Sequence, residues 1–278
     1  MFLTEFGSFI LILNVFSCKL TCVEVSRLLT EERHQFILNQ LKQHAIIKLH
    51  DLISETHASE STVRRDLQLM EEAGLLVRVH GGAKRVATLQ TELAVSEKSN
   101  QSVAEKESLA KLAVSCLTPQ DVIFLDAGTS TLAMIPHLKP IANLTVVTNG
   151  VNHASLLADY DIRCFLIGGQ LKNVTKAVVG ADSVAALQQY RFNKVFLGTN
   201  GIHLHYGFTT PDPDEAAIKR TAIAQAEMAI ILADHTKFDQ VTFTKFGHLA
   251  QATIVTDHLT QRQLDQYQQQ TDILEAIK

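Results

Sequence analysis

Residues 57–85 read HASESTVRRDLQLMEEAGLLVRVHGGAKR, and this stretch decides the fold of the N-terminal part. Ser59 is a typical N-cap residue, so a helix is predicted over residues 60–73. Gly74 follows as the glycine that ends such a helix. At 100° per residue, three apolar side chains fall on one narrow arc and predict the buried face. They are Val63, Leu67 and Met70.

The opposite face of the predicted helix carries hydroxyl, guanidinium and amide groups. Guanidinium groups pair with guanine, amides pair with adenine, and hydroxyls bind phosphate or either base. A recognition helix enters the major groove of DNA with its N-terminal residues. The candidate groove contacts are Ser61, Thr62, Arg64, Arg65 and Gln68.

Two short apolar runs follow on either side of Gly81-Gly82 and predict a two-stranded ribbon over residues 75–86. A ribbon of this kind would lie along the phosphate backbone as a wing. Its candidate contacts are Arg78, His80, Lys84 and Arg85. The alternative is an ordinary three-helix unit whose charged face is merely solvated.

Two more helices are predicted upstream. Thr30 is the capping residue of the first, and two acids follow it in the first turn. Residues 44–48 are predicted to be a short link. The second helix shows the i, i+3, i+4 apolar spacing. Its stripe is Leu49, Leu52 and Ile53.

Two motifs in this region resemble the winged helix-turn-helix of the DeoR family of bacterial sugar-catabolism repressors. They are S-x-x-T-[VI]-R-R-D-L at residues 59–67 and R-x-H-G-G-A at residues 78–83. Residues 29–33, LTEER, are similar to the opening of that family. The resemblance implies a DNA-binding domain over residues 29–86.

The rest of the chain predicts a linker and an α/β domain. Residues 87–105 are polar and lack an apolar stripe, so we expect a linker that leads into a helix over residues 105–117. Six apolar runs then end in small or polar residues and alternate with helical stretches, which predicts a parallel sheet covered on both faces. The runs are residues 122–125, 144–147, 164–167, 195–197, 230–232 and 253–255. The predicted fold class is α/β, with an N-terminal winged helix-turn-helix and a C-terminal α/β domain over residues 106–278.

Polar residues at the strand ends predict a ligand site, because such sheets bind ligands beyond the carboxyl ends of their strands. Residues 126–131, DAGTST, form a glycine and hydroxyl loop before a helix, which suits a phosphate, although many such loops are only turns. Nearby lysines supply cations, each of which has a solvated surface charge as its alternative. The candidate effector-binding residues are Asp126, Gly128, Thr129, Ser130, Thr131, Thr148, Asn149, Gly168, Gly169, Lys172, Asn200, Gly201, Glu215, Lys219 and Lys237, with Arg220 as a further cation.

The same half of the chain resembles the sensor domain of the DeoR family. The motifs are DAGTST, GG-x-L-K, TTP-x-x-x-EAA-x-KR at residues 209–220 and LADHTKF at residues 232–238. Ser130 stands where many members have Thr, and Lys172 stands where many have Arg. The resemblance implies a fold similar to sugar-phosphate isomerases that binds a phosphorylated sugar without turning it over. It is greatest for the fructose-operon branch, which implies fructose 1-phosphate, with lactose/tagatose-phosphate and galactitol repressors as alternatives.

Composition and individual residues bear on three other classes of function: a protein that coats nucleic acid, an enzyme and a metalloprotein. A net charge of −4 over 278 residues excludes a chain that coats nucleic acid, but not a compact binding face. An isomerase is the enzyme alternative, since it needs a carboxylate base such as Asp126, Asp234 or Glu215. Four cysteines show no zinc spacing, and His203-x-His205 is interpreted as a pair of loop residues, so no metal and no cofactor is predicted.

Residues 1–28 have no counterpart in the resemblance and are interpreted as an extension from a start codon placed too early. Their apolar run, residues 9–16, is far shorter than the roughly 20 residues of a membrane helix. Anchoring or export is the alternative. We expect a cytoplasmic homo-oligomer that binds double-stranded operator DNA and a phosphorylated sugar, because symmetric operators call for at least a dimer. Residues 259–278 are predicted to be helical.

Overall fold

The computed structural model describes residues 28–44, 46–86, 88–90 and 92–276. The chain divides into two compact units, residues 1–84 and 85–278, and each is described by itself. The predictions for residues 1–27 lie outside the described residues. Within the described ranges, no helix is long and apolar enough to cross a bilayer.

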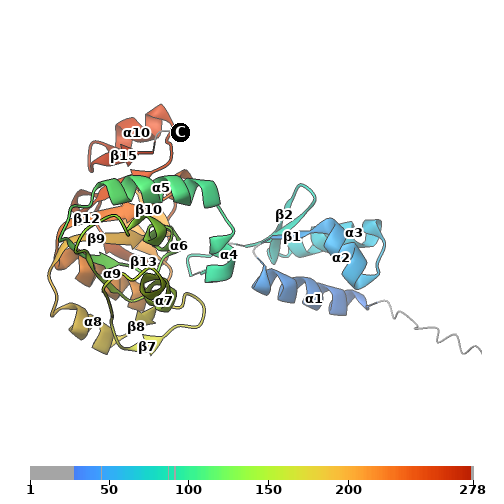
Figure 1. The fold of residues 1–278 in the computed structure, drawn as a ribbon. Helices are drawn as coiled ribbons and strands as arrows, with labels where there is room; N and C mark the ends of the chain where they lie inside the picture. The colour runs from blue at the N-terminus through green and yellow to red at the C-terminus, as the bar shows by residue number, and fades with distance from the viewer. Residues whose placement is uncertain (1–27, 45, 87, 91, 277–278) are drawn as a thin grey trace, which may run out of the picture. The chain divides into compact units, whose positions relative to one another are not determined.

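The described part of the N-terminal unit consists of helices and short strands (Figure 1). The helices are α1 (Thr30–Gln43), α2 (Leu49–Thr56) and α3 (Glu60–Glu72), and the strands are β1 (Ile46–Lys48), β2 (Leu76–Val79) and β3 (Gly82–Arg85). All three helices contribute to one core that contains Ile37, Leu52, Val63, Leu67 and Met70. The predicted buried face of α3 is therefore confirmed.

The ends of α3 follow the prediction, but the start of α1 does not. The amide of Thr62 donates to Ser59 Oγ over 3.2 Å, and Gly74 has a φ of +71° just after the helix. In α1 the N-cap is Leu29, so Thr30 is the first helical residue. Glu32 serves the cap instead, because its Oε2 accepts from the Leu29 amide at 2.9 Å.

Residues 46–48 form a strand, so the predicted link over residues 44–48 is wrong. Strand β1 pairs antiparallel with β3, and the sheet order is β1-β3-β2. A strand of three residues is too short to show alternation in the sequence. The pairing also explains Gly82, where a Cβ would lie 2.0 Å from the carbonyl oxygen of Ile47.

A parallel sheet forms the centre of the C-terminal unit, and its order in the described residues is β15-β14-β12-β9-β4-β5-β6. Each of the six predicted apolar runs forms one strand, so the predicted parallel sheet is confirmed. Of the predicted helical stretch 259–278, the described residues 259–276 are helical only in part, because the edge strand β15 follows a short helix. The strands are β4 (Val122–Leu125), β5 (Thr145–Thr148), β6 (Cys164–Leu166), β9 (Phe192–Gly198), β12 (Ala226–Leu232), β14 (Thr253–Thr256) and β15 (Ile273–Glu275).

Helices cover both faces of this sheet. Helices α5 (Val103–Ser115) and α7 (Val151–Asp159) pack on the face to which Leu125 and Ile230 point. Helices α8 (Ala181–Leu187), α9 (Pro213–Ala224) and α10 (Gln261–Tyr267) pack on the other face, with Phe124 and Ile231. Neighbouring residues in a strand point to opposite faces, so the continuous apolar runs are buried on both sides.

Smaller elements complete the unit, and α4 (Val95–Ser99) lies in the segment that was expected to be a linker. Helix α5 begins at Val103, two residues before the predicted start. Helix α6 (Thr129–Leu132) follows β4, and 3-10 helices span Ile135–His137, His235–Lys237 and Leu249–Gln251. A hairpin joins β7 (Gln170–Leu171) to β8 (Val178–Val179), and an antiparallel sheet contains β10 (Gly201–His203), β11 (Gly207–Thr210) and β13 (Thr244–Gly247).

The connections of the sheet reverse direction at β4. Strands β5 and β6 lie on one side of β4, whereas β9 and β12 lie on the other. At such a switch point the loops that leave the two neighbouring strands turn away from each other and leave a crevice. The loops after β4 and β9 begin at Asp126 and Thr199 and flank this point.

Candidate functional site

The outer face of α3 places the predicted DNA contacts in solvent. Ser61, Arg64, Arg65 and Gln68 are exposed, and Thr62 is half-buried. Arg64 pairs with Glu60 one turn earlier at 2.6 Å, and Gln68 donates to Glu72 over 3.0 Å. Among the described residues, nothing forms a hydrogen bond or ion pair with Arg65. Such a face can exchange its water contacts for DNA contacts without breaking the core.

The residue after the two arginines points the other way. Asp66 is buried, and its carboxylate accepts from Arg33 Nε at 2.7 Å and from Arg33 Nη2 at 3.1 Å. His34 Nε2 lies 3.2 Å from the same carboxylate. This fork joins α1 to α3 and fixes the orientation of the outer face. Both residues, Arg33 and Asp66, lie in motif segments that stand out in the sequence, but the sequence does not show that they pair.

The predicted contacts of the wing lie on β2, β3 and the turn between them. His80 and Lys84 are exposed, and Arg85 is half-buried. The guanidinium of Arg78 lies 3.9 Å from Glu71, whose other oxygen accepts from the Arg78 amide over 2.8 Å. The wing therefore carries positively charged side chains, and the contacts between Arg78 and Glu71 fix its strands relative to α3.

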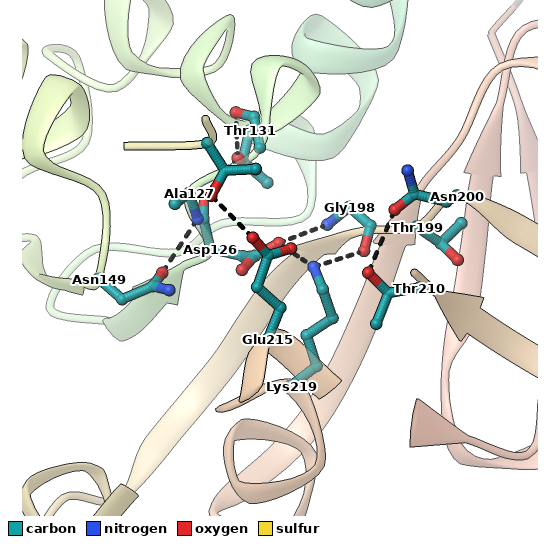
Figure 2. Close-up of polar contacts among 12 residues, drawn as sticks. Asp126, Ala127, Thr131, Asn149, Gly198, Thr199, Asn200, Thr210, Glu215 and Lys219 are labelled. Atoms are coloured by element: carbon teal, nitrogen blue, oxygen red, sulfur yellow. Dashed lines mark hydrogen bonds and ion pairs between the residues drawn. The ribbon is translucent and has the colours of Figure 1, made fainter. Parts of the chain in front are cut away.

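In the C-terminal unit, a buried ion pair lies at the switch point (Figure 2). Asp126 follows β4, and Lys219 extends from α9 to its Oδ2. Both residues are at most 5% exposed. The same Asp126 oxygen accepts from the Gly198 amide at 3.2 Å, and Lys219 Nζ donates to the Gly198 carbonyl at 2.9 Å. The pair thus bridges β4, β9 and α9 at the crevice.

The polar groups around the 126–131 loop mostly bind the loop itself. Asn149 Oδ1 accepts from the Ala127 amide at 3.0 Å, as Figure 2 shows. Thr148 Oγ1 donates to the Leu125 carbonyl at 2.6 Å, and Thr131 Oγ1 donates to the Asp126 carbonyl at 2.6 Å. These side chains hold the shape of the loop. Gly128, Thr129 and Ser130, at the start of α6, keep partial exposure.

A second charged group lies one helical turn from Lys219. Glu215 Oε1 accepts from Thr175 Oγ1 at 2.7 Å and from Lys172 Nζ at 3.2 Å. Lys172 also pairs with Asp212. Burial alone would lower the pKa of Lys172, but Asp212 and Glu215 outweigh burial and raise it. Figure 2 shows that Glu215 and Lys219 both extend from α9 toward the end of β4.

The remaining predicted effector residues divide between structural and accessible positions. Gly169 has a φ of +144°, and a Cβ there would lie 1.9 Å from Ser183 Oγ, while the Gly168 carbonyl accepts from that hydroxyl at 2.7 Å. Gly201 is buried in β10. Asn200 Oδ1 accepts from Thr210 at 3.3 Å, and Lys237 lies 3.5 Å from Asp234. Arg220 is exposed and donates to the Lys245 carbonyl.

The space over the 126–131 loop is nearly closed. A cavity lined by Val95, Gly128, Thr129 and Thr175 has a volume of about 10 Å³, which suits no more than one water molecule. A much larger cavity of about 670 Å³ lies by the first halves of β9, β12 and β14. That cavity is away from the carboxyl ends where α/β sheets bind ligands, so it is not the candidate effector site.

Comparison with known proteins agrees with both halves of the structure. A family model for the DeoR C-terminal sensor domain matches residues 101–258, and one for the DeoR-like helix-turn-helix domain matches residues 33–88. The chain belongs to the DeoR family. It is therefore a transcriptional regulator of that family and not an enzyme, as its sequence predicted.

The chain is similar to two other regulators and, more distantly, to one solved structure. The uncharacterized HTH-type transcriptional regulator FruR of Bacillus subtilis is 45% identical over 251 residues, which are 90% of this chain and 100% of FruR. The lactose phosphotransferase system repressor of Staphylococcus aureus is 32% identical, over 81% of this chain and 90% of that protein. Ribose 5-phosphate isomerase A from Methanocaldococcus jannaschii is 16% identical to this chain, with a TM-score of 0.37. The match covers 48% of this chain and 53% of that one.

Several groups at the site of this DeoR-family protein are not apparent from the sequence. His153 is buried beside the 126–131 loop, and its Nε2 lies 3.1 Å from Thr131 Oγ1. Burial lowers the pKa of His153 to about 4, although the nearby Asp126 carboxylate acts in the opposite direction. Thr175 and Asp212 were missed as well. The only signal for these residues was their place near strand ends and in the TTP motif.

One group in the described residues has donors that suit a metal ion. His235, Asp257 and His258 bring their ligand atoms within 4.8 Å of one another at the ends of β12 and β14. Asp257 Oδ2 already accepts from His235 Nδ1 at 2.7 Å and lies 3.0 Å from His258 Nδ1. The sequence did not reveal this group because His235 lies far from the other two. By contrast, His203 ends β10 and its Nδ1 accepts from the His205 amide in the following turn.

Proposed function

We propose that this DeoR-family chain represses an operon for sugar uptake and catabolism and that a phosphorylated sugar releases it from DNA. The observation that carries the proposal is the presence of both parts in one chain: an exposed cationic face on α3 and a charged site at the switch point of an α/β sheet. The N-terminal unit would bind operator DNA, and the C-terminal unit would bind the effector. Such a protein acts in the cytoplasm, where the chromosome is.

The groove contacts and the backbone contacts have separate roles in this proposal. Arg65 and Gln68 would contact base edges in the major groove, together with Ser61 and Thr62. The basic groups of the wing would bind phosphates, which adds affinity for any sequence. A symmetric operator would place two α3 helices about one turn of DNA apart, so we infer that the protein acts as a dimer or a larger oligomer.

The effector proposal rests on the charges at the crevice. Lys219, Lys172 and Lys237 offer cations to a phosphate, and the amides at the start of α6 offer donors. Asp126, Asn200 and Glu215 offer acceptors to sugar hydroxyls. Coupling of about 1–3 kcal/mol between the two sites would change DNA affinity roughly 5- to 150-fold.

The favoured effector is fructose 1-phosphate, and its support is the similarity to FruR. A hexose phosphate of the lactose/tagatose or galactitol pathways is the second candidate, since the lactose phosphotransferase system repressor is also similar. The two candidates share a phosphate monoester and differ in the sugar that the acceptors must recognise.

A mobility-shift titration tests this function. The full chain is bound to fragments of its own upstream DNA at one fixed salt concentration, and a panel of sugar phosphates is added. We expect one specific fragment to bind and fructose 1-phosphate to release it. Release by another sugar phosphate alone would replace the favoured effector, and binding without release by any of them would contradict the proposed sensor chemistry.

A further inference from the structure

The segment before α5 covers the candidate effector site within the C-terminal unit. The Leu89 carbonyl accepts from the Phe243 amide at 2.9 Å, and the Val95 amide donates to the Val174 carbonyl at 3.2 Å. Val95 itself lines the 10 Å³ cavity over Gly128 and Thr129. Part of the covering segment (residues 88–90 and 92–101) must therefore move before a sugar phosphate can reach the 126–131 loop.

An internal carboxylate from the covering segment binds at the edge of this site. Glu92 pairs with Lys98, and its Oε1 also lies 3.4 Å from Asn200 Nδ2 as an acceptor. The Glu92 side chain is only 13% exposed. Its Oε2 is buried and has no hydrogen-bond partner among the described residues. A buried carboxylate oxygen without a hydrogen-bond donor destabilises the folded state, because the lost contact with water is not replaced. A ligand with a better-matched anionic group can therefore displace Glu92.

A second ammonium group lies beside Lys98, the partner of this carboxylate. Lys106 is 8% exposed, and its Nζ donates to the backbone carbonyls of Lys98 and Gln101 at the C-terminal end of α4. Burial lowers the pKa of Lys106, Asp234 raises it, and the positive charges of Lys237 and Lys98 lower it further. Lys98, Lys106 and Lys237 thus lie near one another, and the carboxylates of Glu92, Asp234 and Glu105 are the acids that act on them.

We propose that Glu92 is an internal competitor of the effector: the phosphate monoester of the effector takes its place on Lys98 and Asn200, and the stretch before α4 that carries Glu92 (residues 92–94) leaves the site while α4 keeps Lys98 in place. A phosphate carries more negative charge than a carboxylate and has three acceptor oxygens, so it satisfies a cluster of cations better. The inference rests on the proposed function and deepens it. Residues 92–94 lie between β3 of the wing and α4 in the chain, so their release changes how the DNA-binding unit is tethered.

The test compares Glu92→Gln with Glu107→Gln in the full-length protein. Glu107 lies on α5 and pairs with Lys111 and His137, so its substitution removes a similar charge elsewhere. Effector affinity is measured by calorimetry with the sugar phosphate that releases DNA, and with inorganic phosphate as a second probe. We expect Glu92→Gln to bind both probes about tenfold more tightly and to release DNA at a correspondingly lower concentration, because the competing state is less populated. Glu107→Gln should match the wild type.

A second measurement keeps the proposal falsifiable if Glu92→Gln is unstable. Hydrogen exchange of the wild-type amides over residues 92–94 should become faster when the effector binds. Slower exchange would mean that the segment closes over the ligand, which would overturn the proposal, as would unchanged or weaker affinity in Glu92→Gln. If no sugar phosphate binds the wild type or releases it from DNA, the proposed function fails and this inference fails with it. If the wild type responds but Glu92→Gln responds identically, only this inference is wrong.

Discussion

The candidate DNA contacts and the candidate effector contacts differ in how the protein satisfies their charges. Arg65 and Lys84 are exposed on a small unit whose core lies behind them. Asp126 and Lys219 are buried and bind each other. Exposed charges contribute little to stability, whereas loss of one partner of a buried pair is strongly destabilising. The DNA-binding face should therefore tolerate substitution without unfolding, whereas the effector site should not.

The largest expected effect is on the buried pair. Asp126→Ala leaves the Lys219 ammonium buried without its carboxylate, so we expect the C-terminal unit to lose about 3–5 kcal/mol of unfolding free energy. Urea denaturation followed by circular dichroism measures the loss. Asp182→Ala removes an exposed acid from the first turn of α8 and serves as the control. Equal stability of the two variants would show that the Asp126–Lys219 pair does not hold this site together.

In conditions where Asp126→Ala is folded, its function can also be tested. The N-terminal unit has its own core, so operator binding should persist. Release by the effector should be lost, because an acceptor for the sugar and the position of Lys219 are both lost. Release at the wild-type effector concentration would remove Asp126 from the proposed site.

The next largest effect is a pH dependence confined to the C-terminal unit. The pKa of His153 falls from 6.5 to about 4 on burial, so the unfolded chain binds more protons than the folded one between these values. Stability is therefore complete above about pH 6.5 and falls as the pH drops toward 4, by about 3 kcal/mol in total. Denaturation at pH 7 and pH 5 should show about 2 kcal/mol of this loss in the wild type. It should be smaller in His153→Gln, and an equal slope in both would assign the pH dependence to other groups.

The two units also differ in how much of them the sequence revealed. The helix α3, its cap at Ser59 and the glycine after it could be predicted because capping and periodicity are local properties. The six apolar runs of the sheet could be predicted for the same reason. Strands β1 and β15 could not, because each has only two apolar residues before a charged one and is held by its partner, β3 or β14.

The candidate site follows the same rule. Asp126, Asn149 and Lys219 could be singled out as residue types near strand ends, but their pairings come from the fold. Asn149 and Thr131 form hydrogen bonds with the backbone of the 126–131 loop. The spacing of residues in the sequence does not distinguish this structural role from ligand binding. Glu92 was missed because it lies in a polar segment without a pattern, and only the tertiary contact with Asn200 gives it a place at the site.

A smaller effect is expected on the DNA-binding face, and it should appear in affinity alone. Arg65→Ala removes an exposed guanidinium that has no hydrogen-bond or ion-pair partner in the part of the chain that the structure describes, so the unfolding free energy should stay the same. Specific operator binding should weaken by about 1–3 kcal/mol if Arg65 contacts a base. Mobility shifts at fixed salt measure this change. Arg191→Ala, at an exposed position of the C-terminal unit, is the control. An unchanged operator affinity would exclude Arg65 as a base contact.

The smallest effect is expected in the wing, where it should be independent of sequence. Lys84 is exposed on β3, opposite Ile46. As a proposed wing residue it would contact a phosphate and not a base edge. Lys84→Ala should weaken binding to specific and unrelated DNA by the same factor and lower the slope of affinity against salt by about one. Lys84→Arg keeps the charge and should keep the slope. A loss confined to the operator would mean that the wing contributes to sequence recognition, and the division between a helix that specifies and a ribbon that only binds phosphate would then be wrong.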